Sequence, residues 1–240
     1  MALVSAHRGG AGDDHALQNT LAAYEAAIQA GCDFVEFDVR LTADGRPVLF
    51  HDDRLESGGR HRSISHHTFD DFAGGLVELD ALLTLIAGRV GAHVDLKVRG
   101  GEIDIVASVI DALGVGNVII TTAEDSSVRT IQRWAHQHAP GLLVGLSSSA
   151  RSHGRGLVPR WKAQIASGFP RLRIWLSGAN LVVSHKLVAR LSLKAYARRR
   201  GLQLVVWTVD GEDELSRWMN DPDVWMVTTN YPERAIAARR

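Results

Sequence analysis

Short apolar runs alternate with amphipathic helical patterns along almost the whole of this 240-residue chain. Such alternation is typical of βαβ units, in which helices join parallel strands. Eight strands with helices between them fit a closed barrel better than an open sheet, and such a barrel is usually about 250 residues long. We therefore expect an α/β fold, a single (β/α)8 TIM barrel that forms one domain over residues 1–240. The expected strands are Leu3–Ala6, Phe34–Leu41, Ala92–Val98, Asn117–Thr121, Leu142–Leu146, Asn180–Ser184, Gln203–Thr208 and Val224–Val227.

The expected helices lie between these strands. Thr20–Ala30 carries apolar residues at helical spacing and is followed by Gly31, which suits the position just after a helix end. The stretch Ser147–Pro170 is expected to mix loop and helix around Trp161–Ala166. The other expected helices are Leu79–Ala87, Ile103–Leu113, Ser126–His138, Lys186–Arg200, Glu212–Met219 and Pro232–Arg239.

An insertion is expected after the second strand. Pro47–Phe50 follows the turn residues Asp44 and Gly45, a pattern that predicts a hairpin return from that strand. Arg54–Asp71 is rich in Gly, Ser, Arg and His and is expected to form a long polar loop. The barrel should therefore carry a small hairpin and loop insertion at this point.

Charge and cysteine content exclude several classes of protein. Lys plus Arg and Asp plus Glu number 27 each, a balance that argues against a nucleic-acid binder. Cys32 is the only cysteine, which excludes an intrachain disulfide and a cysteine-rich zinc site. The chain does not begin like a signal peptide, and no apolar run approaches the roughly 18 residues of a membrane span. We expect a cytoplasmic protein without stable membrane insertion.

Charged side chains recur on one face of two expected strands. Glu36 and Asp38 alternate with apolar residues, so both carboxylates point the same way, and Asp95 and Lys97 repeat this pattern. Two anions inside a barrel are costly unless a cation offsets them, and Mg²⁺ or Ca²⁺ takes oxygen ligands of this kind. The alternatives are an edge strand with exposed acids and a structural Asp–Lys pair.

Two histidines directly follow expected strands. His7 comes after the first strand, at the end of the barrel where active sites lie, and His51 directly follows the short run Pro47–Phe50. Imidazoles titrate near neutral pH and can serve as acid and base, although a lone histidine is more often a surface or core residue. Arg8 offers a planar set of donors that suits a phosphate group.

With these residues assembled, the sequence resembles the glycerophosphodiester phosphodiesterase family. The resemblance depends on an ordered set of short motifs over most of the chain, none of which is specific alone. The motifs are His7-Arg8-Gly9, Gln18-Asn19-Thr20, Glu36-Phe37-Asp38, Asp44-Gly45, Pro47-Val48, His51-Asp52, Asp95-Leu96-Lys97, Trp207-Thr208-Val209-Asp210 and Thr228-Thr229-Asn230-Tyr231-Pro232.

The resemblance implies a TIM barrel, one divalent metal ion, Mg²⁺ or Ca²⁺, and hydrolysis of glycerophosphodiesters to an alcohol and glycerol 3-phosphate. It also implies that a neighbouring glycerol hydroxyl attacks the phosphorus and that water then opens the cyclic phosphate. By position, His7 and His51 match the acid/base pair. The other matches are Glu36, Asp38 and Asp95 to metal ligands, Arg8 and Lys97 to phosphate contacts, and Trp207 to a residue lining the substrate pocket.

Two departures from the family pattern affect the expected substrate. Gln18 replaces a glutamate, which removes a charge, and Asp95 replaces a glutamate, which shortens the third ligand. An Asp-x-Lys pair also resembles the phospholipase D relatives on the same barrel, which act on lysolipid or sphingolipid head groups. The alternatives are therefore such an enzyme, with Phe169–Leu176 as a candidate membrane-facing stretch, or a barrel that binds a phosphorylated ligand without turnover.

Overall fold

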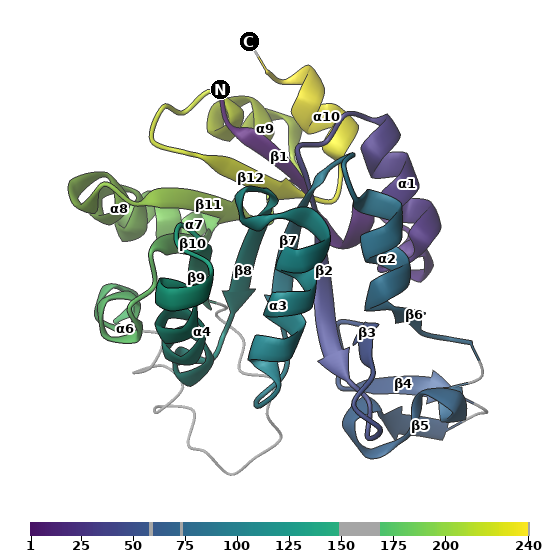
Figure 1. The fold of residues 1–240 in the computed structure, drawn as a ribbon. Helices are drawn as coiled ribbons and strands as arrows, with labels where there is room; N and C mark the ends of the chain where they lie inside the picture. The colour runs from purple at the N-terminus through teal and green to yellow at the C-terminus, as the bar shows by residue number, and fades with distance from the viewer. Residues whose placement is uncertain (58–59, 73, 149–168, 240) are drawn as a thin grey trace.

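The chain folds into a closed barrel of eight parallel strands (Figure 1). The computed structural model describes residues 1–57, 60–72, 74–148 and 169–239. The first strand pairs in parallel with both the last strand and the second, and this closes the barrel. The predicted (β/α)8 barrel is confirmed. Its strands are β1 (Leu3–Ala6), β2 (Phe34–Leu41), β7 (Gly91–Leu96), β8 (Val118–Thr122), β9 (Leu143–Ser148), β10 (Leu181–His185), β11 (Gln203–Trp207) and β12 (Met226–Thr229).

Helices cover the outside of the barrel, as Figure 1 shows. Their positions agree with the predicted ones in all but two respects: the helix Pro170–Ser177 was not predicted, and the single helix expected between 186 and 200 is interrupted by a π-helical turn at Ala189–Leu193. The expected helix around Trp161–Ala166 lies outside the described residues. No helix in the described part is long and apolar enough to cross a membrane. The helices are α1 (Leu21–Gln29), α2 (Leu79–Ile86), α3 (Glu102–Leu113), α4 (Asp125–His138), α6 (Pro170–Ser177), α7 (Lys186–Val188), α8 (Lys194–Arg200), α9 (Glu212–Met219) and α10 (Pro232–Ala237).

The insertion after β2 contains more strand than the sequence indicated. β3 (Pro47–Leu49) returns antiparallel to β2 as predicted, and β6 (Val77–Glu78) pairs with β3. The prediction of a long polar loop over Arg54–Asp71 is wrong, because β4 (Arg54–Ser57) and β5 (Arg60–Ser63) form a separate antiparallel hairpin. Polar residues fill most of this hairpin, so the apolar alternation that reveals a half-buried strand is missing.

The barrel interior changes from apolar to polar along the strand direction. At the N-terminal end, a cluster of inward side chains fills the space between the strands; it comprises Phe34, Ile119, Leu181, Val183, Val205 and Met226. Two residues beyond Phe34 on the same face come Glu36 and then Asp38, both of which are buried. The apolar layer therefore fills the N-terminal end of the barrel. The charged side chains lie at the C-terminal end, where barrel active sites lie.

Gly9 joins the first strand to the first helix under tight packing. Its φ is +87°, and a Cβ there would lie 2.7 Å from the Cβ of Ala23 on α1. We expect Gly9→Ala to lower the free energy of unfolding by about 2 to 4 kcal/mol, from a positive φ and from overpacking. Gly31→Ala is the matched control, since Gly31 has a φ of +86° and no atom within 4 Å of the added Cβ. Urea unfolding of both variants separates the two costs, and equal losses would contradict the packing argument.

Candidate active site

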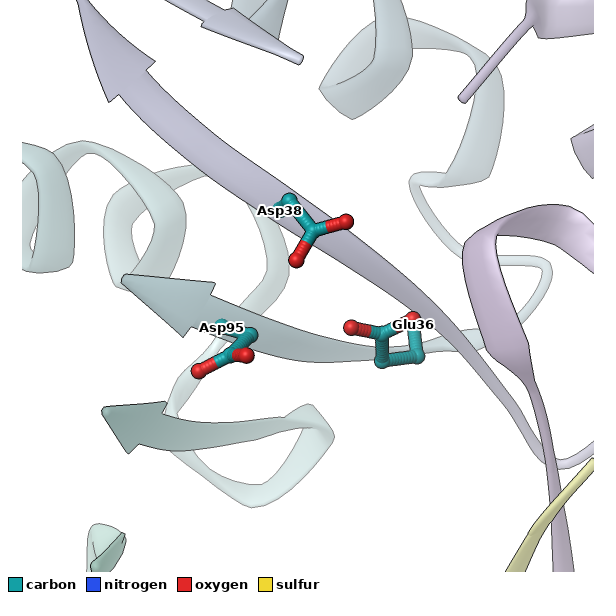
Figure 2. A group of neighbouring side chains, drawn as sticks. All are labelled: Glu36, Asp38 and Asp95. Atoms are coloured by element: carbon teal, nitrogen blue, oxygen red, sulfur yellow. The ribbon is translucent and has the colours of Figure 1, made fainter. Parts of the chain in front are cut away.

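Three carboxylates meet at the C-terminal end of the barrel (Figure 2). Glu36 and Asp38 lie on β2, and Asp95 lies on the neighbouring strand β7, directly opposite Asp38 in the parallel register. One ligand oxygen from each residue lies within 4.8 Å of the others. Glu36 is 4% exposed and Asp38 is 1% exposed. The expected convergence of the three acids is therefore present, and the alternative of exposed edge-strand acids is wrong.

Two cationic side chains contact this acidic cluster. Arg8 Nε lies 3.1 Å from Asp38 Oδ2, and the backbone N–H of Arg8 donates to Glu36 Oε2 at 2.7 Å. Lys97 Nζ donates to Asp95 Oδ2 at 2.5 Å and lies 3.2 Å from Asp38 Oδ1. Arg8 has a φ of +49°, an uncommon conformation for a residue with a side chain. Because this conformation aims both its backbone N–H and its guanidinium at the carboxylates, the first loop is shaped around the site.

The charges in the cluster do not balance. Burial raises the pKa of Glu36 well above its usual range, and the nearby carboxylates of Asp38 and Asp95 raise it further. Burial also opposes the charge of Asp38, but Lys97 and Arg8 outweigh it and hold the pKa of Asp38 low. The two cations thus stabilise the negative charge of Asp38 but do not compensate the negative charge of Glu36. Three clustered oxygen donors with this deficit fit a hard divalent cation.

His7 is oriented by a chain of hydrogen bonds from the opposite end of the sequence. Its Nδ1 lies 2.7 Å from Asn230 Oδ1, and Asn230 Nδ2 donates to Asp210 Oδ2 at 2.9 Å. Because that amide donates to Asp210, its oxygen faces His7, so Nδ1 carries the proton and Nε2 is the acceptor. Nε2 lies 4.0 Å from Glu36 Oε2. Burial lowers the pKa of His7, and Arg8 lowers it further.

His51, like His7, is held through Nδ1 and leaves its Nε2 available as an acceptor. It follows β3, and its Nδ1 lies 2.8 Å from Asp52 Oδ1, so Nδ1 donates and Nε2 again stays free to accept. Arg40 holds the backbone oxygen of His51 through Nε at 3.2 Å and a terminal nitrogen at 2.7 Å. Burial lowers the pKa of His51, with Arg8 and Lys97 contributing. Both histidines are therefore mostly neutral near pH 7.

Gln18 lies beside the acidic cluster and is not one of its three carboxylates. Its Oε1 accepts from a terminal nitrogen of Arg8 at 3.0 Å, and its Nε2 lies 2.9 Å from His15 Nδ1.

Trp207 ends β11, where its ring meets the ring of His185 edge-on at 5.9 Å between centroids. The indole N–H of Trp207 is buried and has no hydrogen-bond partner in the described part of the chain.

Several residues that support the cluster were not among the sequence candidates. Asn19, with a φ of +58°, donates to Asp38 Oδ2 at 3.3 Å, and the Tyr24 hydroxyl donates to Asn19 Oδ1 at 2.7 Å. Thr121 donates to Asp95 Oδ1 at 3.1 Å and lies 3.3 Å from Nε2 of the buried His93. Asn19 belongs to the motif Gln18-Asn19-Thr20, so the sequence could have indicated its place in the site. Thr121 lies near the end of a mostly apolar strand, and no sequence pattern marked it as a site residue.

The chain is similar to known proteins over nearly its full length. The model of the glycerophosphoryl diester phosphodiesterase family matches residues 7–117. A glycerophosphodiester phosphodiesterase of Caldanaerobacter subterraneus is 25% identical over 98% of this chain and 96% of its own. A lysophospholipase D of Mus musculus is 24% identical over 88% of this chain and 74% of its own.

Solved structures are similar to this chain in fold. A phosphodiesterase of Oleispira antarctica, solved in complex with the product sn-glycerol-3-phosphate, superposes with a TM-score of 0.72, 20% identity and coverage of 99% of this chain and 96% of its own. The family match includes His7, Arg8, all three carboxylates, His51 and Lys97. The chain is therefore similar to the glycerophosphoryl diester phosphodiesterase family over residues 7–117, and to individual phosphodiesterases over nearly its full length.

Proposed function

We propose that this protein hydrolyses glycerophosphodiesters to an alcohol and glycerol 3-phosphate, with residues 1–240 acting as one barrel domain. The observation that carries the proposal is the convergence of three carboxylates, two cations and two neutral imidazoles at one end of the barrel. The names of the relatives and the product bound to the Oleispira antarctica enzyme support the same substrate class.

Glu36, Asp38 and Asp95 are the proposed ligands of one divalent ion, Mg²⁺ or Ca²⁺. The donor set is all oxygen, and the raised pKa of Glu36 marks a position that needs additional positive charge. When bound, such an ion offsets the negative charge that develops on the phosphate oxygens during the reaction. Thr121 and Asn19 keep Asp95 and Asp38 in their orientations, as outer hydrogen bonds do at metal sites.

The side chains of the site have separate roles in the proposed reaction. Arg8 and Lys97 donate hydrogen bonds to the phosphate oxygens and keep the phosphorus beside the histidines. One imidazole accepts the proton of the attacking hydroxyl through Nε2, and the other, once protonated, donates a proton to the leaving alkoxide. His7 and His51 share these two roles. Trp207 lines the pocket that holds the rest of the substrate.

The decisive experiment measures the products formed from glycerophosphocholine. We expect choline and glycerol 3-phosphate to be released, release to stop when EDTA removes the divalent ion, and Mg²⁺ or Ca²⁺ to restore it. A barrel that only binds a phosphorylated ligand would release no choline under any of these conditions. Release that is unchanged by EDTA would contradict the proposed metal site while leaving hydrolysis intact.

A phospholipase D-like activity on lysophospholipids is the second candidate. Two observations favour it: the similarity to the mouse lysophospholipase D and the exposure of Trp175, which is 61%. The candidate membrane-facing stretch Phe169–Leu176 thus has an exposed aromatic ring rather than a core one. Comparing kcat/KM for lysophosphatidylcholine and glycerophosphocholine on the same preparation distinguishes the two substrate classes.

A further inference from the structure

Charge is strongly segregated along this chain although the total is zero. Residues 126–209 contain 14 Lys and Arg and no Asp or Glu, while all 27 acids lie outside this segment. The segment supplies α6, α7, the π-helical turn and α8 on one side of the barrel (Figure 1). Acidic neighbours reach it only from outside, as when Lys186 pairs with Glu214 at 2.5 Å and Lys194 with Asp221 at 2.6 Å.

Exposed apolar side chains gather on the same side. Nine large hydrophobic residues are exposed in the described part of the chain, and six of them belong to α6 and to the helical turns after β10. Apolar patches of this kind mark interaction sites with proteins or membranes. We call these six residues the α6 patch: Phe169, Leu172, Trp175, Leu176, Leu187 and Leu191.

The two halves of the α6 patch form one surface edged by arginines. Arg171 on α6 donates to the backbone oxygen of Ser192 in the π-helical turn at 3.1 Å, so the two elements lie side by side. Arg171 and Arg190 are both exposed, and neither forms an ion pair with any described residue. Apolar and aromatic side chains flanked by arginines that have no carboxylate partner among the described residues are the composition that binds the interface of an anionic bilayer.

The α6 patch borders the catalytic end of the barrel. Arg173 on α6 contacts Asp125 at 2.5 Å and the backbone oxygen of Ala123, and both follow the C-terminal end of β8. Leu187 comes two residues after His185, whose ring contacts Trp207. A flat surface that touches this patch would therefore lie next to the barrel opening.

We propose that the α6 patch is a docking surface for anionic phospholipid bilayers. Its apolar side chains enter the region between head groups and acyl chains, and Arg171 and Arg190 contact lipid phosphates. Docking of this kind adds to the proposed hydrolysis, because it places the opening of the barrel at the source of lipid-derived phosphodiesters. Residues 169–194, which carry the patch, contain no Asp or Glu, so the patch has no carboxylate of its own to repel anionic head groups.

Vesicle sedimentation tests this proposal with the full chain. We expect binding to phosphatidylglycerol vesicles, weak binding to phosphatidylcholine vesicles, and a loss of binding as salt rises. The double variant Leu172→Gln and Trp175→Gln should bind phosphatidylglycerol at least tenfold more weakly. Replacing Arg171 or Arg190 by Gln should weaken binding about fivefold each. Arg217→Gln on α9 is the matched control, because Arg217 is exposed but lies outside the acid-free segment.

Turnover of the soluble substrate glycerophosphocholine should be unchanged in the patch variants, which verifies that they are folded. Failure of the wild-type chain to bind phosphatidylglycerol vesicles would overturn the proposal, and so would equal binding by the double variant. Light scattering tests a different occupant of the patch. A wild-type dimer that becomes monomeric in the double variant would show that a second copy of the chain covers the patch, which would overturn the proposal. The vesicle-binding and light-scattering measurements do not require catalysis, so the docking surface and the hydrolytic activity can fail separately.

Discussion

Replacing His51 by alanine is expected to lower the turnover of glycerophosphocholine by about a hundredfold or more, and His7→Ala should have an effect of similar size. Each imidazole is held through Nδ1, one by Asn230 and the other by Asp52, so each presents Nε2. Burial keeps the pKa of both histidines below the usual value, so both imidazoles are unprotonated and able to accept a proton near neutral pH. Alanine removes the group proposed to transfer the proton and leaves the carboxylate cluster in place.

The measurement is kcat at saturating substrate for both single variants and for the double variant. His136→Ala on α4 is the matched control, because His136 is exposed and lies outside the site. If the two histidines serve one proton-transfer sequence, the double variant should lose little more than either single variant. Near-normal turnover in both single variants would eliminate the proposed acid/base pair.

Glu36→Gln is expected to lower activity strongly without destabilising the metal-free protein. Glu36 is buried, and burial together with Asp38 and Asp95 raises its pKa, so its negative charge opposes folding at neutral pH. Glutamine removes that charge and keeps an oxygen to accept the backbone N–H of Arg8. Turnover should fall about a thousandfold, because the loss of a metal ligand removes several kcal/mol of transition-state stabilisation.

The free energy of unfolding, measured with and without divalent metal, separates these effects. The wild-type chain should gain about 2.7 kcal/mol when the metal is at a hundred times its Kd, and the variant should gain much less. In EDTA the variant should be at least as stable as the wild type. A variant that is clearly less stable than wild type in EDTA would contradict the assigned charge imbalance.

Glu102→Gln is the matched control for this comparison. Glu102 is a buried glutamate on α3 that accepts a hydrogen bond from Ser127 Oγ at 2.6 Å. Burial opposes its charge, but the bonds from Ser127 and from backbone N–H groups lower its pKa. A lowered pKa means that the charged form stabilises the fold above the pKa of the unfolded state, and this stability is lost as pH falls. Glu102→Gln should therefore destabilise the protein and leave metal binding intact.

Strand alternation predicted which side chains share a face at the centre of the site. Glu36 and Asp38 had to share one face because side chains alternate along a strand, and the same rule paired Asp95 with Lys97. The barrel then brings the two strands side by side, with Asp38 opposite Asp95. The end of the first strand placed His7 at the catalytic end, and the family resemblance paired His51 with it. Their catalytic roles stay predictions, since position alone does not measure them.

The surroundings of the site could not be predicted because they depend on distant pairings. His7 is oriented by Asn230, which lies 223 residues along the chain, and nothing in the local pattern links the two. The positive φ of Arg8 is set by packing around the loop rather than by a glycine at that position. The β4–β5 hairpin was missed for a different reason: its polar residues do not show the alternation on which strand prediction depends.

Asp38 and Asp95 lie opposite each other on neighbouring parallel strands. The proposed chemistry is therefore confined to a few consecutive strands of the barrel. Every proposed metal ligand, both histidines and the two proposed phosphate-binding cations lie between residues 7 and 97, whereas Trp207 and the α6 patch belong to the other part of the ring. That second part also contains Asp210 and Asn230, the pair that orients His7. A chimaera joined after β8 should therefore transplant a substrate preference without loss of turnover only if it keeps this pair.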